Sequence, residues 1–197
     1  MALALAIRRG RWDEMRAVVV ATFAFNLVSI GACLIEVLIG RAQPIVYVIG
    51  AASALIVGLT WSLLRRHGAT PRGPRDVARW VVALLVLATA AAAFFGLAPL
   101  FPKAFADLAG YHGTDKFVYR QAGAATFGYA LMGIWELRSL RWEELRLPTV
   151  MALVFNGMSF VASLLELGAV TVGVALVAPA SLLFTVGTAV ALARRGR

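Results

Sequence analysis

The stretch RWDEMRAVVVATFAFNLVSIGACLIEV covers Arg11–Val37, and a closely similar stretch, RWEELRLPTVMALVFNGMSFVASLLEL, covers Arg141–Leu167. At a constant offset of 130 residues, Arg11–Glu36 and Arg141–Glu166 share 11 of 26 residues. Each stretch begins with a charged box of Arg, Trp and Glu and continues into an apolar run. About 20 mostly apolar residues are enough for an α-helix to cross the hydrocarbon core of a bilayer. The sequence therefore predicts a transmembrane helix that occurs twice.

The composition of the whole chain also indicates a membrane protein. The chain has 197 residues, 61% of them hydrophobic and 15% charged, and its mean hydropathy is +0.82. A soluble domain carries about 25% charged residues. The net charge of +9 is confined to short segments between apolar runs, which argues against nucleic-acid binding. The single cysteine, Cys33, excludes an internal disulfide.

Six apolar segments are long enough to span a membrane. They are continuous rather than alternating, which favours helices over a β-barrel. The fourth segment is short and has polar ends, but its centre is rich in small residues that allow close helix packing. We therefore predict an all-α polytopic integral membrane protein, a single membrane domain over residues 1–197. Its six predicted transmembrane helices are Ala17–Ile39, Pro44–Leu64, Trp80–Leu100, Gln121–Leu137, Pro148–Leu167 and Val170–Ala193.

The distribution of Arg and Lys predicts the orientation in the membrane. Fifteen of the nineteen lie in four alternate segments: 1–16, 65–80, 138–146 and 194–197. The other four are Arg41, Lys103, Lys116 and Arg120. Because positive residues concentrate in cytoplasmic loops, we expect both termini in the cytoplasm, most simply of a prokaryotic plasma membrane, and the loop 99–120 outside. The first residues, MALALAIRRGRW, have the reverse order of a secretory signal peptide, so we expect no cleavage.

The duplication includes a second helix. Val57-Gly58 followed by Leu63-x-Arg65-Arg66 recurs as Val186-Gly187 followed by Leu192-x-Arg194-Arg195, at an offset of 129. The repeated unit is therefore a two-helix hairpin, residues 11–66 and 141–195, with a helix pair in the intervening residues 67–140. Both copies are expected to start in the cytoplasm. The repeat is then parallel, with a pseudo-two-fold axis along the membrane normal.

Each copy of the first helix carries a polar stripe. At 100° per residue the members of each stripe fall within one arc of about 80°. The first stripe consists of Asn26, Ser29, Cys33 and Glu36, and the second of Asn156, Ser159, Ser163 and Glu166. Because polar groups would lack partners in lipid, we expect both stripes to face the protein interior.

Two interpretations of the stripes stay open. In one, the Asn and Ser side chains join helices by hydrogen bonds, while the glutamates contact water at the outer interface or pair with Arg41 or Arg120. In the other, the stripes line a pathway or binding site on the pseudo-two-fold axis, with the glutamates as proton or cation carriers. If the hairpins pack about this axis, Asn26 and Asn156 should approach each other.

The charged box at the start of each copy predicts an anchor at the membrane interface. Trp12 and Trp142 suit the headgroup level, where aromatic residues concentrate. Arg16 and Arg146 can contact lipid phosphates or pair with the nearby Glu14 and Glu144. This anchoring role is independent of any transport function.

No catalytic or metal-binding motif is present in the sequence: GxSxG, HExxH, a Walker loop and CxxC are all missing, and His67 and His112 each stand alone. We therefore expect no enzyme activity, no cofactor and no metal. The favoured function is a transporter or channel for an ion or small solute, with the stripes as its pathway. The alternative is a non-transporting membrane subunit or assembly scaffold, and a membrane-embedded enzyme comes third. The expected partners are the lipid bilayer and either a second copy or a larger membrane complex. A transporter requires an internal cavity, whereas a scaffold should be packed dry.

Overall fold

The computed structural model describes residues 12–67, 75–100, 116–165 and 172–195. Within these residues the chain is helical and contains no strand, which confirms the predicted all-α fold. A short 3-10 turn, η1 (Ala98–Leu100), follows the third long helix. The six long helices are α2 (Trp12–Leu38), α3 (Pro44–His67), α4 (Arg79–Leu97), α6 (Lys116–Ser139), α7 (Trp142–Leu165) and α8 (Val172–Arg195).

Five of the described helices are long and apolar enough to cross a membrane: α2, α3, α4, α7 and the Val177–Arg194 part of α8. This confirms that the chain is helical and that five of its described helices have the length and apolar composition of membrane spans. Helix α6 falls short because charged residues near both of its ends lower its hydropathy: Lys116, Arg120, Glu136 and Arg138. Its 24 residues nevertheless correspond to a length of about 36 Å at 1.5 Å per residue. As a sixth span, α6 stays a prediction.

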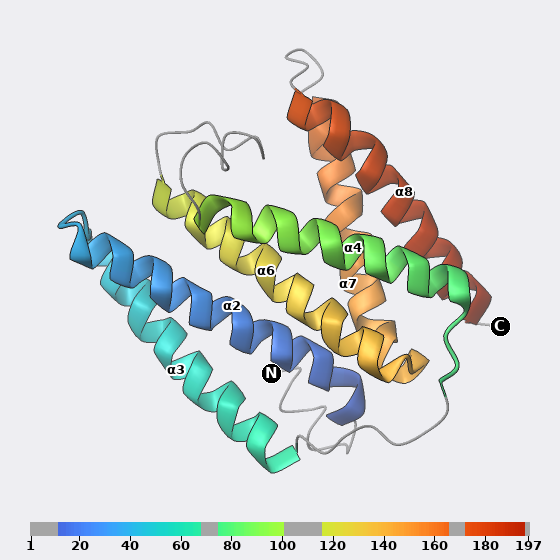
Figure 1. Cartoon of the computed structure of the whole chain (residues 1–197), viewed down its shortest axis with the longest axis horizontal. Helices are drawn as coiled ribbons and strands as arrows, with labels where there is room; N and C mark the ends of the chain where they lie inside the picture. The colour runs from blue at the N-terminus through green and yellow to red at the C-terminus, as the bar shows by residue number, and fades with distance from the viewer. Residues whose placement is uncertain (1–11, 68–74, 101–115, 166–171, 196–197) are drawn as a thin grey trace.

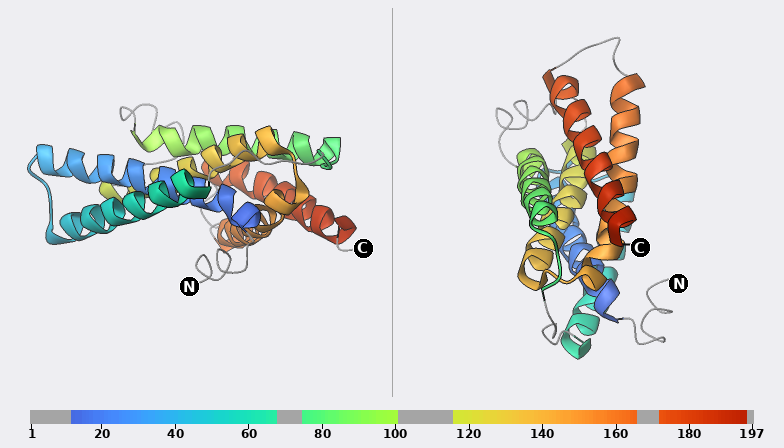
Figure 2. Two further views of the ribbon diagram at one scale, coloured as in Figure 1. Left: turned by 90° about the horizontal axis from the view of Figure 1, so that it is seen from below. Right: turned by 90° about the vertical axis from the view of Figure 1, so that its right-hand side faces the viewer.

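The helices form three antiparallel hairpins, α2–α3, α4–α6 and α7–α8 (Figure 1). Helix α6 lies in the middle and packs against both α2 and α4. The α7–α8 hairpin crosses this layer steeply and lies to one side of α4 and α6 (Figure 2). It contacts the rest of the molecule mainly through α7 against α2 and through α8 against α4. The turn between α6 and α7 lies at the same end of the bundle as the start of α2 and the end of α8 (Figure 1), and this end is here named the α6–α7 end.

Small residues explain how α6 fits between its neighbours. A Cβ atom added at Gly96 of α4 would lie 2.5 Å from the backbone nitrogen of Phe127. One added at Gly128, toward α2, would lie 2.8 Å from the carbonyl oxygen of Ala21. Helices in membranes use such residues to bring their backbones together. Because α6 is enclosed on both sides, its Glu136 side chain is buried in protein.

Local hydrogen bonds set the ends of two helices. Gly40, with φ of +69°, ends α2 in a Schellman motif: its N–H donates to Val37 O at 3.1 Å, and Arg41 N–H donates to Glu36 O at 3.0 Å. The turn from α6 to α7 is so short that Leu140 adopts φ of +49°. Helix α7 is capped from a distant segment, since Trp142 N–H donates to Asp76 Oδ1 at 2.8 Å.

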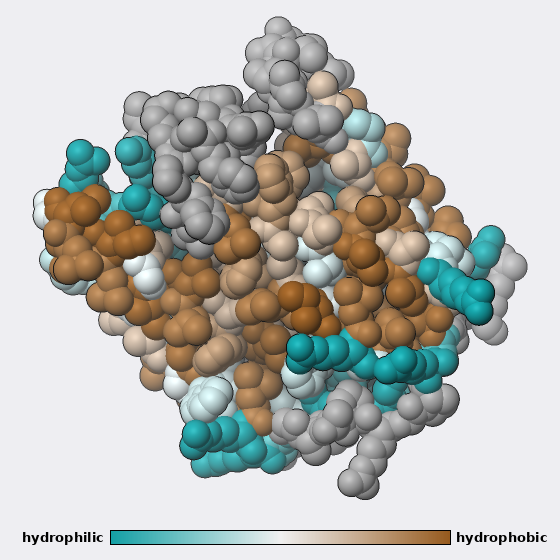
Figure 3. Space-filling model, in the orientation of Figure 1, coloured by the Kyte–Doolittle hydropathy of each residue, from teal (hydrophilic) through white to brown (hydrophobic). Residues whose placement is uncertain are grey.

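The surface matches a lipid environment. Large apolar side chains are widely exposed, including Val48 and Leu55 of α3 at 63% and 66%. Figure 3 shows a mostly apolar face with polar residues gathered at its edges. In water such a face would be a liability, whereas in a bilayer it costs nothing.

Candidate functional site

The first stripe is buried against α3 and α6. Ser29 donates a hydrogen bond to Gln121 Oε1 of α6 at 2.7 Å and accepts one from Ser53 of α3 at 3.2 Å. The Asn26 amide donates back along its own helix to Thr22 O at 2.8 Å. Both Asn26 and Ser29 are buried, at 3% and 0% exposure. These contacts join three helices and correspond to the packing interpretation of the stripe.

The outer part of the first stripe is also occupied by protein contacts. Glu36 forms an ion pair with Arg120 of α6, and both side chains are largely buried. The side chain of Gln121 donates to the Cys33 sulfur at 3.7 Å. Of the two arginines considered as partners for the Glu36 side chain, Arg120 is the one that pairs with it. The backbone N–H of Arg41 instead donates to the backbone oxygen of Glu36.

The second stripe has different surroundings. Asn156 and Ser159 donate to backbone carbonyls one turn back on α7, at 2.8 and 2.9 Å, and both line a cavity. Ser163 donates in the same way to Ser159 O at 2.8 Å. Glu166 lies outside the described residues. Asn26 is not among the residues that line this cavity. A site shared by Asn26 and Asn156 stays a prediction.

The cavity lies between α4, α6, α7 and α8 and has a volume of about 590 Å³. Its walls are mostly apolar and include the rings of Phe95, Tyr129, Phe155 and Phe184. The Tyr129 and Phe155 rings pack with their centroids 5.4 Å apart. A cavity of this size and lining is typical of small-molecule sites.

The Ser and Thr hydroxyl groups in the cavity wall share one property. Each donates its hydrogen to a carbonyl of its own helix, and the donors are Thr89, Thr126, Thr149, Ser159, Ser181 and Thr188. A hydroxyl has one hydrogen to donate and two lone pairs that accept. These groups therefore have their acceptor oxygens left for a ligand.

Glu136 of α6 lines the cavity at its α6–α7 end. The residue is 3% exposed, and its Oε1 has no hydrogen-bond partner. Among the residues that the structure describes, no Arg, Lys or His forms an ion pair with it. An ionised carboxylate in this position is costly unless a ligand or a proton compensates its charge.

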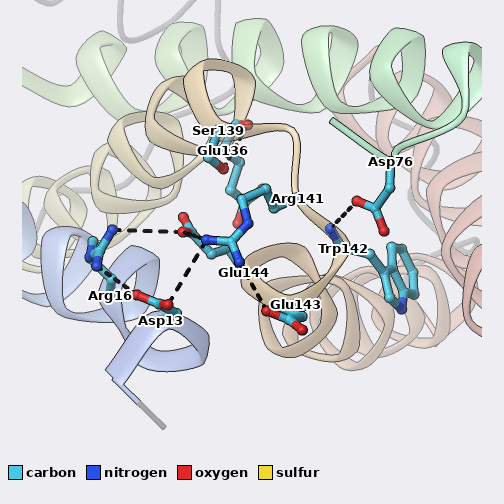
Figure 4. Close-up of polar contacts among 9 residues, drawn as sticks. All are labelled: Asp13, Arg16, Asp76, Glu136, Ser139, Arg141, Trp142, Glu143 and Glu144. Atoms are coloured by element: carbon cyan, nitrogen blue, oxygen red, sulfur yellow. Dashed lines mark hydrogen bonds and ion pairs between the residues drawn. The ribbon is translucent and has the colours of Figure 1, made fainter. Parts of the chain in front are cut away.

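Beside Glu136 lies a buried ionic cluster, here named the Glu144 cluster (Figure 4). Glu144 of α7 is 0% exposed, and its Oε1 lies 3.7 Å from guanidinium nitrogens of both Arg16 and Arg141. Arg16 also contacts Asp13 at 2.6 Å, and Arg141 contacts Glu143 at 3.1 Å. The cluster thus ties the start of α2 to the start of α7.

Four carboxylates lie near the two arginines of the Glu144 cluster. These arginines are shared among Asp13, Glu143 and Glu144, and Glu136 adds a fourth carboxylate close enough to repel Glu144. Among the described residues that line the cavity, Glu136 is the one charged side chain. Within the described residues, no group of three or more His, Cys, Asp or Glu side chains could hold a metal ion.

The predicted interface anchors have divided roles. Arg16 is only 3% exposed and pairs with Glu144 of the other hairpin, so its side chain is committed to protein rather than to lipid phosphate. Arg146, which matches Arg16 at the offset of 130 residues in the sequence, is exposed. The Trp12 ring packs against His67 with 5.3 Å between ring centroids.

Sequence reasoning missed Glu136 and the Glu144 cluster. Glu136 is a carboxylate near the end of the fourth predicted span, where the sequence indicates only a polar end of the segment. A carboxylate inside a membrane segment is by itself a signal for a functional site. The partners of Glu144 could not be found this way, because Arg16 lies in a distant part of the sequence.

Comparison of the chain with protein-family models, with curated proteins and with solved structures finds no match. Function therefore has to be inferred from the residues and their geometry.

Proposed function

We propose that the protein is a small multi-pass membrane carrier whose solute binds in the cavity between α4, α6, α7 and α8. The observation that carries the proposal is a cavity of about 590 Å³ ending at the unpartnered carboxylate of Glu136. Cavities with mostly apolar walls and a few polar groups are the usual form of small-molecule sites. Ionisable residues buried in a membrane bundle are likewise most often functional.

A carrier fits the cavity better than a pore does. Leu145 and Ala191 line the cavity at its α6–α7 end and are only 2% and 3% exposed. Glu144, next to Leu145, is completely buried. The burial of these residues supports a mechanism in which helices move to expose the site alternately to each side.

The unequal packing of the hairpins indicates which part would move. The α2–α3 hairpin is joined to α6 by the hydrogen bonds of Ser29 and by the Glu36–Arg120 ion pair. The cavity separates the α7–α8 hairpin from much of α4 and α6. In the proposed mechanism, α2, α3, α4 and α6 form the static part. The α7–α8 hairpin moves against it about the Glu144 cluster, which holds the start of α7 to the start of α2.

The proposal includes the finer features expected from the sequence: six spans with α6 as the fourth, both termini in the cytoplasm, and a parallel duplicated hairpin. The length of α6 and its enclosure between α2 and α4 support a sixth span. The 11 of 26 residues shared by the two copies support duplication. The different surroundings of the two stripes suggest that the copies have taken separate roles, one in packing and one at the cavity.

A non-transporting scaffold is the second candidate. The direct contacts of the first stripe with α3 and α6 favour it, because they engage the polar groups of that stripe with protein. The two candidates differ in whether the cavity takes up a solute.

The test is flux into proteoliposomes that contain the purified protein, measured with a panel of radiolabelled cationic, neutral and anionic organic solutes. Ala152→Trp would fill the cavity, and Ala51→Trp, on the exposed face of α3, is the matched control. A carrier should move at least one solute, lose this activity with Ala152→Trp and keep it with Ala51→Trp. Flux that survives Ala152→Trp, or no flux of any solute by folded protein, would contradict the proposal.

A further inference from the structure

The cavity walls restrict the ligand to one with an apolar body. Side chains from all four helices contribute apolar surface, among them Leu84, Phe95, Met132 and Phe184. A small inorganic ion would lose its hydration shell there without gaining enough ligands in return. An organic molecule with apolar groups instead gains by leaving water.

The charge at the α6–α7 end restricts the ligand further. Glu136 is buried and its Oε1 has no partner, while both nearby arginines are already engaged with other carboxylates. A cationic group beside Glu136 would supply the missing opposite charge. An anionic group would add to the repulsion between Glu136 and Glu144.

The remaining polar groups of the wall favour the same sign of charge. Its hydroxyls present acceptor oxygens because their hydrogens are donated to backbone carbonyls. The faces of Tyr129 and Phe155 also attract cations, because aromatic rings are negative at their faces. An anion would find few free donors in this wall.

We propose that the cavity binds an organic monocation with an apolar body, and that Glu136 is the counter-charge of the bound cation. This inference rests on the proposed carrier function for its physiological meaning, but binding itself is measurable without transport. Glu136 would act as a ligand-binding residue that determines specificity by charge.

Two probes of nearly the same shape and opposite charge test the inference. Tetraphenylphosphonium is a cation and tetraphenylborate an anion, and both carry four phenyl rings. Equilibrium binding to the full-length protein in lipid nanodiscs, corrected for binding to empty nanodiscs, would be measured for both. We expect saturable binding of tetraphenylphosphonium at least about tenfold tighter than that of tetraphenylborate, since a buried opposite charge attracts and a like charge repels.

Variants of the carboxylates locate the effect. Glu136→Gln keeps the shape of the side chain and should weaken tetraphenylphosphonium binding by about tenfold or more. Glu136→Asp keeps the charge and should retain most of the affinity. Asp76→Asn, at an exposed carboxylate of the same end that lies outside the Glu144 cluster and does not line the cavity, should bind like the unmodified protein. The folded state of each variant would be checked by its thermal unfolding.

The outcomes separate this inference from the carrier proposal. Equal binding of both probes, no saturable binding of the cation, or undiminished binding by Glu136→Gln would overturn the inference. If Glu136→Gln does not fold, the comparison of the two probes in the unmodified protein decides. Saturable cation binding without flux of any solute would leave the inference standing and remove the carrier. Flux of a neutral or anionic solute that Ala152→Trp blocks, without cation binding, would overturn the inference and leave the carrier proposal standing.

Discussion

Replacing Gly96 with alanine should destabilise the protein, whereas the same replacement at Gly58 should not. The added methyl group at Gly96 would lie 2.5 Å from the backbone nitrogen of Phe127 and 2.7 Å from its Cα. Backbone atoms of a packed helix cannot move aside as the tip of a flexible side chain can. At Gly58 the same methyl group meets no atom within 4 Å. The pair therefore separates steric conflict between α4 and α6 from the general effect of alanine in a helix.

The expected magnitude follows from two opposing effects. Over-packing of a tight contact costs about 1–3 kcal/mol, and the better helix propensity of alanine returns at most about 1 kcal/mol. We expect Gly96→Ala to lower the free energy of unfolding by about 1–2 kcal/mol. For a chain of this size that corresponds to a fall of roughly 2–8 °C in melting temperature. Gly58→Ala should leave the melting temperature unchanged or raise it slightly.

The lone cysteine provides the assay. Cys33 is the single cysteine of the chain and is 5% exposed, so a fluorogenic maleimide should react with it only when the surrounding helices separate. Heating the purified protein with this reagent then reports unfolding directly. If Gly96→Ala melts at the same temperature as the unmodified protein, α4 and α6 are not packed as closely as described.

Three further predictions use the same protein. Arg16→Gln should lower the free energy of unfolding by about 3 kcal/mol, because it removes one partner of the buried Glu144 carboxylate. Arg146→Gln, at an exposed arginine, should change it by less than about 0.5 kcal/mol. Equal melting temperatures of the two variants would contradict the contacts of the Glu144 cluster. Asp76→Ala should cost about 1 kcal/mol through loss of the α7 cap, and an unchanged melting temperature would show that the cap contributes nothing in solution. In a background without the native cysteine, Arg75→Cys should be shielded from an impermeant maleimide in intact cells, because its segment is predicted to be cytoplasmic, and Lys116→Cys should react. The opposite labelling pattern would reverse the proposed orientation.

The positions of the helices could be predicted because long apolar runs have few other interpretations. The second predicted span, Pro44–Leu64, corresponds to α3, Pro44–His67. The fourth predicted span, Gln121–Leu137, lies within α6, which begins earlier, at Lys116. Its first turns carry charges that look like a loop in sequence, but one of them, Arg120, is held by Glu36 of α2.

The partners of the polar residues could not be predicted in the same way. Helical periodicity places Ser29 and Glu36 on one face of α2, but it does not say which helix packs there. That helix is α6, the span with the weakest sequence signal, whose Gln121 and Arg120 complete the contacts. Contacts between distant segments depend on how hairpins pack, which a single sequence does not contain.

The cavity was beyond prediction for a related reason. Gly58 and Gly187 occupy matching positions in two similar sequence segments, yet a Cβ atom at Gly187 would lie 2.5 Å from Leu84 Cδ1, while one at Gly58 would meet no atom within 4 Å. Matching residues therefore meet different neighbours, because α4 packs beside α8, whereas among the described residues no helix packs against the Gly58 face of α3. The cavity arises where this intervening helix pair meets the second hairpin.

The contact between Arg16 and Glu144 has a consequence for biosynthesis. Arg16 leaves the ribosome about 130 residues before Glu144, which at about 5–20 residues per second is an interval of roughly 6–25 s. During this time Asp13 is the one carboxylate of the Glu144 cluster that has been synthesised. It lies 2.6 Å from Arg16 in the finished protein. Once α7 is inserted, the buried carboxylate of Glu144 completes the pairing. A chain truncated before α7 would lack Glu144, so Arg16 of its first helix would have one carboxylate partner fewer than in the finished molecule.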